Sequence, residues 1–268
     1  MNYLIAPQYK LPAEAYFEES WLIQEKRKIF GASWLYAGQT SEFHEHGSYK
    51  TIKAGLDELV VVRDKHDQLN AFHNVCRHRG AQLVQGTGQC GTLVCPYHKW
   101  TYGLDGHLRG VAKHDQFTDI DNMSLGLHPA SVETWMGLVF INANEHPTES
   151  LTEWLGDIGK ELAPFGADKL ELLKSDTISF EANWKFYIEN HIDWLHLWFV
   201  HPETLAALDH DKGQFEQLGR HWVSYEPAKR EHAQAYKTSS PLPDIPHVKD
   251  AIGRYSENGA HFIFPNLP

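Results

Sequence analysis

The sequence predicts an α+β protein in which an antiparallel β region is flanked by helical segments. Apolar residues recur at helical spacing between residues 12 and 34. From about residue 49 to 144, short β-type runs alternate with turn signals, which is typical of a compact antiparallel β domain. Helical patterns return after Pro147. In this chain of 268 residues we expect N-terminal helices over 1–40 that pack on the last domain, a β domain over 41–146 and a last domain over 147–268.

Within the β region, the sequence predicts a hairpin followed by shorter strands. Residues 58–63 and 69–75 form two apolar runs around a polar turn. Residues 91–95 predict a short strand, and Asp105-Gly106 predicts a tight hairpin because this dipeptide suits positive φ. Residues 131–143 predict one strand that Gly137 bends or breaks.

After Pro147, the elements alternate between helix and strand. A helix is expected over residues 149–165, where Ser150 precedes Glu153 by three residues and fits a capping box. Residues 175–182 predict a strand. A long aromatic helix then runs from residue 183 to His201, since a residue before proline disfavours the α region. Residues 234–249 predict a loop, and "AHFIFPNLP" predicts a final strand with an exposed apolar edge.

The composition argues against several classes of protein. Lys plus Arg number 24 and Asp plus Glu number 35, and this net charge of −11 argues against a nucleic-acid binder. No run of about 18 apolar residues could span a membrane. The N-terminus turns acidic too early for a secretory signal. Three cysteines make no disulfide framework, so we expect a cytoplasmic protein whose cysteines serve metal or redox chemistry.

All three cysteines lie in "NVCRHRGAQLVQGTGQCGTLVCPYHKW", and two of them are paired with histidines. Cys76 and His78 form C-x-H, and Cys95 and His98 form C-x-x-H. Each half offers one thiolate and one imidazole from a short loop. A tetrahedral zinc site could use this set, and so could a Rieske-type [2Fe–2S] cluster. Cys90 matches no ligand position and is expected to be a small loop residue.

The residues around these pairs favour the cluster. "CRHRG" and "CPYHKWTYGLDGHLRG" resemble the Rieske domain of ring-hydroxylating-type non-haem iron oxygenases over most of residues 58–142. The resemblance implies that Cys76 and Cys95 hold one iron of a [2Fe–2S] cluster, and that His78 and His98 hold the other. One departure is Lys99, because the family usually has glycine there. A nearby cation favours the more negative, reduced cluster, so we expect Lys99 to raise the cluster potential.

A second constellation lies in "NWKFYIENHIDWLHLWFVHP". In one straight helix, Asp193 and His196 would share a face, whereas His196 and His201 would point about 140° apart. Pro202 ends the helix, so His201 can turn inward from a distorted last turn. Two histidines and one carboxylate on ferrous iron form the facial triad of O₂-activating enzymes.

This segment resembles the iron-binding helix of the same oxygenase family, including its D-x-x-H-x-x-x-x-H pattern. The resemblance implies a helix-grip (START-like) catalytic domain in which His196 and His201 bind a mononuclear Fe(II). It also implies that Asp193 is the catalytic bridging carboxylate, which connects His98 of one subunit to His196 of its neighbour in a homotrimer. The family takes its third iron ligand from a later helix, so we expect this chain to be C-terminally short, with a partial catalytic domain. It is expected to be either a truncated product of a longer enzyme or a naturally short relative in which another group or water completes the iron site.

The resemblance implies the terminal oxygenase component of a Rieske non-haem iron system. Such a component uses O₂ and electrons from an NAD(P)H-dependent reductase, with or without a ferredoxin, and aromatic hydrocarbon catabolism is a typical setting. The expected substrate is a small aromatic or amine compound that is hydroxylated, dihydroxylated or oxidatively demethylated. Two alternatives stay open, a Rieske-type electron carrier and an inactive oxygenase without a complete mononuclear site. The presence of the last domain, residues 147–268, argues against the electron carrier, whereas the missing third ligand of the mononuclear iron argues for it.

Overall fold

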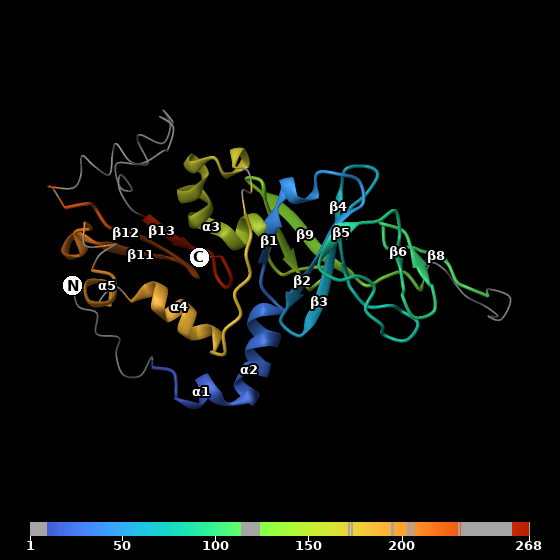
Figure 1. Ribbon diagram of the computed structural model, residues 1–268, viewed down its shortest axis with the longest axis horizontal. Coiled ribbons are helices and arrows are strands. Elements are labelled where there is room, and N and C mark those ends of the chain that lie inside the picture. The colour runs from blue at the N-terminus through green and yellow to red at the C-terminus, as the bar shows by residue number, and fades with distance from the viewer. Residues whose placement is uncertain are drawn as a thin grey trace.

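The computed structural model describes residues 10–113, 124–170, 172, 174–193, 196–202, 205, 207–229, 231 and 259–267. A seven-stranded antiparallel sheet fills the middle of the molecule, a small sheet lies at one end, and helices with a third sheet lie at the other (Figure 1). The predicted α+β class is confirmed. Within the described residues, no helix is both long and apolar enough to cross a membrane.

The N-terminal segment is helical, as predicted. It contains α1 (Glu14–Phe17), α2 (Glu19–Glu25) and a π-helical turn (Lys26–Phe30). Strand β1 (Leu35–Gln39) then enters the seven-stranded sheet and pairs with β10, and a 3₁₀ turn (Thr40–Phe43) follows it. The last residues of the segment 1–40 therefore lie in the sheet, and the domain boundaries stay a prediction.

The seven strands follow the order β1-β10-β9-β4-β3-β2-β5. Besides β1, they are β2 (Ser48–Ala54), β3 (Asp57–Arg63), β4 (Leu69–His73), β5 (Thr87–Gln89), β9 (Pro129–Trp135) and β10 (Leu138–Asn142). The predicted hairpin is β3–β4. The break predicted at Gly137 is present, but it separates two antiparallel strands, so β9 and β10 form a hairpin rather than one bent strand. Met136 and Gly137 both have positive φ, 51° and 76°, which closes a two-residue turn.

Strand β3 divides the core of this sheet between its two faces, because successive side chains of a strand point in opposite directions. Val60 and Val62 pack into the core that contains both paired cysteines. Leu59 and Val61 pack into a second core on the opposite face, with residues of β1 and β10. The cysteine pair thus packs against one face of a strand whose four central residues, 59–62, are fully buried.

The last domain contains α3 (Leu151–Leu162) and a sheet of order β11-β12-β13, with β11 (Gln214–Leu218), β12 (His221–Tyr225) and β13 (Gly259–Phe262). Short 3₁₀ turns lie at Ala163–Phe165, Ala167–Lys169 and His210–Lys212. The predicted capping box of Ser150 and Glu153 is present. Strand β13 is an edge strand, as predicted, but the apolar side chains of its Phe262 and of the following Ile263 are not exposed. Phe262 and Ile263 are both 2% exposed, and Ile263 packs in one core with residues of α3.

Two predictions about residues 175–201 are wrong. Residues 174–182 form no strand, and Ile178 is 84% exposed, because no described strand pairs with this segment. The long helix is broken into α4 (Trp184–Ile192) and α5 (Leu197–Val200). The predicted loop at 234–249 lies outside the described residues.

Candidate metal centres

Two loops of the same construction carry the cysteine–histidine pairs. The first begins after β4, and a bridge between Val75 and Gln82 closes it. The second is the tip of the hairpin formed by β6 (Leu93–Val94) and β7 (Thr101–Tyr102), in a small sheet completed by β8 (Leu108–Gly110). In each loop the cysteine N–H donates to the backbone five residues ahead, at 2.8 Å, and the cysteine C=O accepts from the backbone four residues ahead.

The four predicted cluster ligands lie together. Cys76 and Cys95 are free thiols, about 2% and 1% exposed, in one core. The rings of His78 and His98 have centroids 4.7 Å apart and planes at 70°. Imidazoles bound to one metal at about 2 Å have centroids roughly 5 Å apart. The loops therefore bring two thiols and two imidazoles together in the pairs that a Rieske cluster requires.

Tyr102 supports this centre. Its hydroxyl accepts the Arg77 N–H at 3.1 Å and lies 3.4 Å from Cys76 Sγ, so it can donate its own hydrogen to the sulfur when Cys76 is a thiolate. Burial raises the pKa of the Cys76 thiol, while the Tyr102 hydroxyl lowers it and favours the thiolate that binds iron. Sequence reasoning gave Tyr102 no role, although the "WTY" that follows the second loop was part of the resemblance.

Stacking on Trp100 orients the His78 ring, and burial favours its neutral form. The indole of Trp100 stacks on the His78 ring at 4.9 Å with planes 5° apart. Burial, with the nearby charges of His98 and Arg79, lowers the pKa of His78 and keeps its imidazole in the neutral form that binds metals.

Lys99 adopts a left-handed backbone conformation with φ 58°. Glycine reaches this region without steric cost, whereas a residue with a Cβ atom is strained there. The position therefore has a conformational reason to prefer glycine. The Lys99 side chain itself is exposed.

Asp193, His196 and His201 are brought together by a break between two helices, and not by lying on one face of a single helix. Helix α4 ends at Ile192, and Asp193 is extended with φ −86° and ψ 108°. His196 precedes α5, and His201 leaves it with φ −121° and ψ 44°. The rings of His196 and His201 thus lie with centroids 5.5 Å apart, and His196 Nδ1 lies 3.4 Å from Asp193 Oδ2.

The distance between these two rings suits binding to one metal ion by the same criterion as for the first centre. Among the described residues, no group of three His, Cys, Asp or Glu side chains converges on one metal position. A Rieske cluster does not require such a group, because its four protein ligands are divided between two irons, two on each. The second centre has two imidazoles and the adjacent Asp193, and Asp244 and Asp250 lie outside the described residues.

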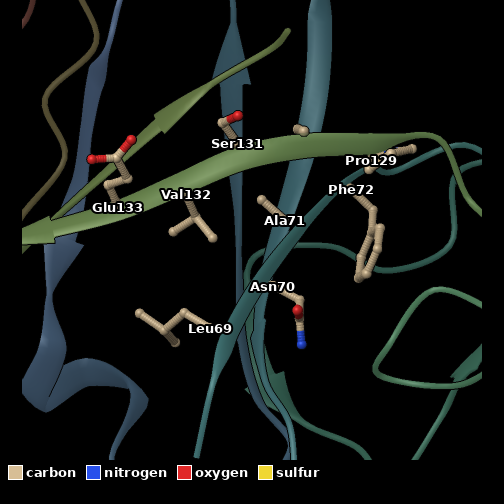
Figure 2. Close-up of a pocket in the computed structure, with 9 residues that line it drawn as sticks. Leu69, Asn70, Ala71, Phe72, Pro129, Ser131, Val132 and Glu133 are labelled. Atoms are coloured by element: carbon tan, nitrogen blue, oxygen red, sulfur yellow. The ribbon is translucent and has the colours of Figure 1, made fainter. Parts of the chain in front are cut away.

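A pocket of about 280 Å³ lies elsewhere, between β4 and β9. These strands pair only at Ala71–Ala130 and Phe72–Pro129, and then separate. Figure 2 shows Leu69 and Val132 in the gap that results. None of the predicted ligands lines this pocket, so we do not assign it to substrate.

Comparison with known proteins accounts for both centres. Residues 33–129 match the Rieske [2Fe-2S] domain, and residues 166–268 match the ring hydroxylating alpha subunit (catalytic domain). The chain belongs to the ring-hydroxylating Rieske oxygenase family. Both predicted cofactors, a [2Fe–2S] cluster and a mononuclear iron, are implied by this membership, and the donor sets described above fit them. The assignment of individual ligands stays a prediction.

Named relatives share the chain's sequence over most of its length. It is 37% identical to the glycine betaine monooxygenase oxygenase subunit of Chromohalobacter salexigens, over 75% of this chain and 45% of that protein. It is 32% identical to the chloroplastic choline monooxygenase of Beta vulgaris, over 96% of this chain and 55% of that protein. The chain spans about half the length of these relatives.

Solved structures of Rieske oxygenases match the fold of this chain. A quaternary ammonium Rieske monooxygenase matches with a TM-score of 0.75 and 30% identity, over 81% of this chain and 60% of that chain. Naphthalene 1,2-dioxygenase with bound indole matches with a TM-score of 0.76 and 25% identity, over 91% and 62%. The family's combination of a Rieske domain with a mixed helix and antiparallel-sheet catalytic domain is therefore the fold of this chain.

Proposed function

We propose that this chain is the terminal oxygenase component of a Rieske non-haem iron system. The observation that carries the proposal is that one chain holds both donor sets, the cysteine–histidine loops and the facing rings of His196 and His201. When bound, a Rieske cluster supplies single electrons, and a ferrous iron with open positions supplies O₂ activation.

The chain's own residues would bind and orient these groups. Cys76 and Cys95 lie in the core, which excludes water from their sulfurs. Asp193 lies beside His196, where a carboxylate can accept an imidazole N–H and fix the ring. The Asp193 side chain is 50% exposed. We infer that it reaches His98 of a second copy, which would make the working unit a homotrimer.

We infer a small amine as the substrate, hydroxylated or oxidatively demethylated. The relatives that share at least 30% identity include enzymes named for glycine betaine, choline and carnitine. This support favours amines over the aromatic hydrocarbons expected as one possibility from the resemblance. The proposed partners are an NAD(P)H-dependent reductase, with or without a ferredoxin, and the proposed location is the cytoplasm.

The second candidate function is an electron carrier or an inactive oxygenase. It is favoured by the absence, among the described residues, of a third side chain that converges with His196 and His201. Such a protein would be reduced by the reductase but would not consume O₂ in response to a substrate.

Substrate-dependent O₂ uptake tests the proposal. The iron-loaded chain is mixed with a reductase and NADH, and O₂ uptake is recorded with glycine betaine, choline, carnitine and naphthalene. We expect uptake with at least one amine, none with naphthalene, and loss of uptake in His196→Ala. Equal uptake by wild type and His196→Ala would contradict the proposal, and reduction without uptake would support the electron carrier.

A further inference from the structure

Helices α1 and α2 of the N-terminal segment hold α4 through a group of polar contacts that we call the clamp. In the clamp, Tyr16 and Glu25 contact three residues of α4: Trp184, Lys185 and Glu189. Lys185 Nζ lies 2.6 Å from Glu25 Oε1, and the indole N–H of Trp184 donates to Glu25 Oε2 at 2.8 Å. Figure 1 shows α4 next to α1 and α2. The contacts join residues about 160 positions apart in the sequence.

The ion pair of the clamp is buried. The side chain of Lys185 is 8% exposed and that of Glu25 is 10% exposed. Burying two charges costs desolvation energy, and well-packed apolar residues of similar size often stabilise a fold as well or better. Stability alone therefore does not explain this pair, whereas its directional hydrogen bonds define one position for α4 relative to α2.

Tyr16 adds contacts at the N-cap of α4 and in its second half. Its backbone C=O accepts from the side chain of Asn183, the N-cap residue of α4, at 3.1 Å. Its hydroxyl donates to the carboxylate of Glu189. This hydrogen bond, helped by burial, raises the pKa of Tyr16 to about 12, so the hydroxyl remains a donor. Contacts at residues 183, 185 and 189 fix both the rotation of α4 and its position along its axis.

Glu189 links the clamp to the second metal centre. Its side chain accepts from Tyr16, and its backbone C=O accepts the N–H of Asp193 at 3.0 Å. Asp193 in turn lies beside His196. Elsewhere on this segment, Tyr187 and Ile192 of α4 and Phe199 of α5 are exposed. A one-residue shift of α4 would move Asp193 by about 1.5 Å and turn it by about 100°.

We propose that Glu25 is a positioning residue for the mononuclear iron centre, which it places through Lys185 and α4. This inference rests on the proposed function, since it assumes that His196 and His201 bind a metal. Ligand sets tolerate displacements of only about 0.5 Å, so a loosened α4 would weaken metal binding without touching a ligand.

Cobalt(II) binding tests the inference. The metal-free second centre is titrated with Co²⁺, and the dissociation constant and visible spectrum are recorded together with the cluster's midpoint potential. We expect Glu25→Gln and Lys185→Met to weaken Co²⁺ binding roughly tenfold and to alter the spectrum, because supporting contacts of metal ligands have effects of about this size. The cluster potential should not change. Lys185→Arg, which keeps the charge, should restore most of the affinity.

Two further variants separate positioning from general stability. Glu42→Gln is the matched control, because Glu42, in the 3₁₀ turn after β1, forms a Glu–Lys pair with Lys50 of β2 at the same 2.6 Å, away from α4. It should bind Co²⁺ like wild type. Tyr16→Phe removes one hydrogen bond of the clamp and should fall between wild type and Glu25→Gln, which gives a milder test if Glu25→Gln folds poorly.

The outcomes distinguish this inference from the proposed function. If Glu25→Gln and Tyr16→Phe bind Co²⁺ with the wild-type constant and spectrum, the clamp is merely structural and the inference is wrong. If His196→Ala and His201→Ala bind Co²⁺ as tightly as wild type, or wild type binds none, the second centre itself is wrong and the inference falls with it.

Discussion

The hydroxyl of Tyr102 lies 3.4 Å from Cys76 Sγ and accepts the Arg77 N–H. A thiolate can only accept a hydrogen bond, so the hydroxyl would donate to the sulfur when Cys76 binds iron. A hydrogen bond to a cluster sulfur stabilises the reduced, more negative state more than the oxidised state. Hydrogen bonding to the sulfurs is one of the means by which proteins set the potential of such clusters.

Tyr102→Phe should therefore lower the midpoint potential of the cluster. A difference of about 1 kcal/mol between the redox states corresponds to roughly 40 mV for one electron. The measurement is a redox titration followed by the electron paramagnetic resonance of the reduced cluster. Tyr102 is fully buried, and phenylalanine keeps its ring in the core. An unchanged potential in a variant that retains its cluster would show that the hydroxyl does not tune it.

Lys99→Gly should change stability and potential together. Glycine removes the strain of a left-handed lysine, which costs about 1–2 kcal/mol, but it also makes the unfolded chain more flexible. We expect a net gain of roughly 0.5 kcal/mol in the free energy of unfolding, measured in urea. The loss of the cation should lower the cluster potential slightly, because exposed charges are screened.

Lys99→Ala is the matched control for that variant. Alanine removes the charge but keeps a Cβ atom at the same positive φ. It should therefore lower the potential as Lys99→Gly does, without the gain in stability. A gain in stability for both variants would mean that the lysine charge, rather than the backbone, is the unfavourable feature. Equal potentials in all three proteins would remove the predicted role of Lys99.

Asp64 should make stability depend on pH in the acid range. Burial raises the pKa of Asp64, but hydrogen bonds from the backbone N–H groups of Gln68 and His66 and from Asn70 outweigh it and lower the pKa overall. A carboxyl whose pKa is lowered in the folded state stabilises the fold above its unfolded value. This contribution is lost as the pH falls from about 4 through the folded pKa.

Urea unfolding of wild type and Asp64→Asn between about pH 3 and 7 measures this contribution. We expect Asp64→Asn to be less stable by about 1 kcal/mol at pH 7, since charged acceptors bind more strongly than neutral ones. The two proteins should converge as the pH falls below about 4. A constant difference over the whole range would show that Asp64 does not titrate with folding.

The first centre could be predicted from the sequence because its information is local. Each thiol and imidazole pair lies within four residues of one loop, and the two loops resemble a known pattern. The supporting roles of Tyr102 and Trp100 could not be predicted in the same way, because they depend on where a neighbouring hairpin places a hydroxyl and a ring.

The second centre shows where local reasoning fails. Helical periodicity runs through residues 183–200, so it predicts one helix and places His196 and His201 on different faces. The structure breaks that helix after Ile192, where Asp193 becomes extended. The strand predicted at 175–182 fails for a related reason, since a strand requires a partner and its own residues do not reveal one. Gly137 predicts a break in the strand, but a hairpin turn there could not be predicted, because methionine rarely adopts the positive φ that Met136 has.

The most direct test of the account is the content of iron and acid-labile sulfide in protein purified without oxygen. The account predicts three iron ions and two sulfides per chain, from one [2Fe–2S] cluster and one mononuclear iron. His196→Ala should then retain two irons and both sulfides. Two irons and two sulfides in the wild-type chain itself would contradict the oxygenase proposal, because the cluster would be present while the second centre bound no iron.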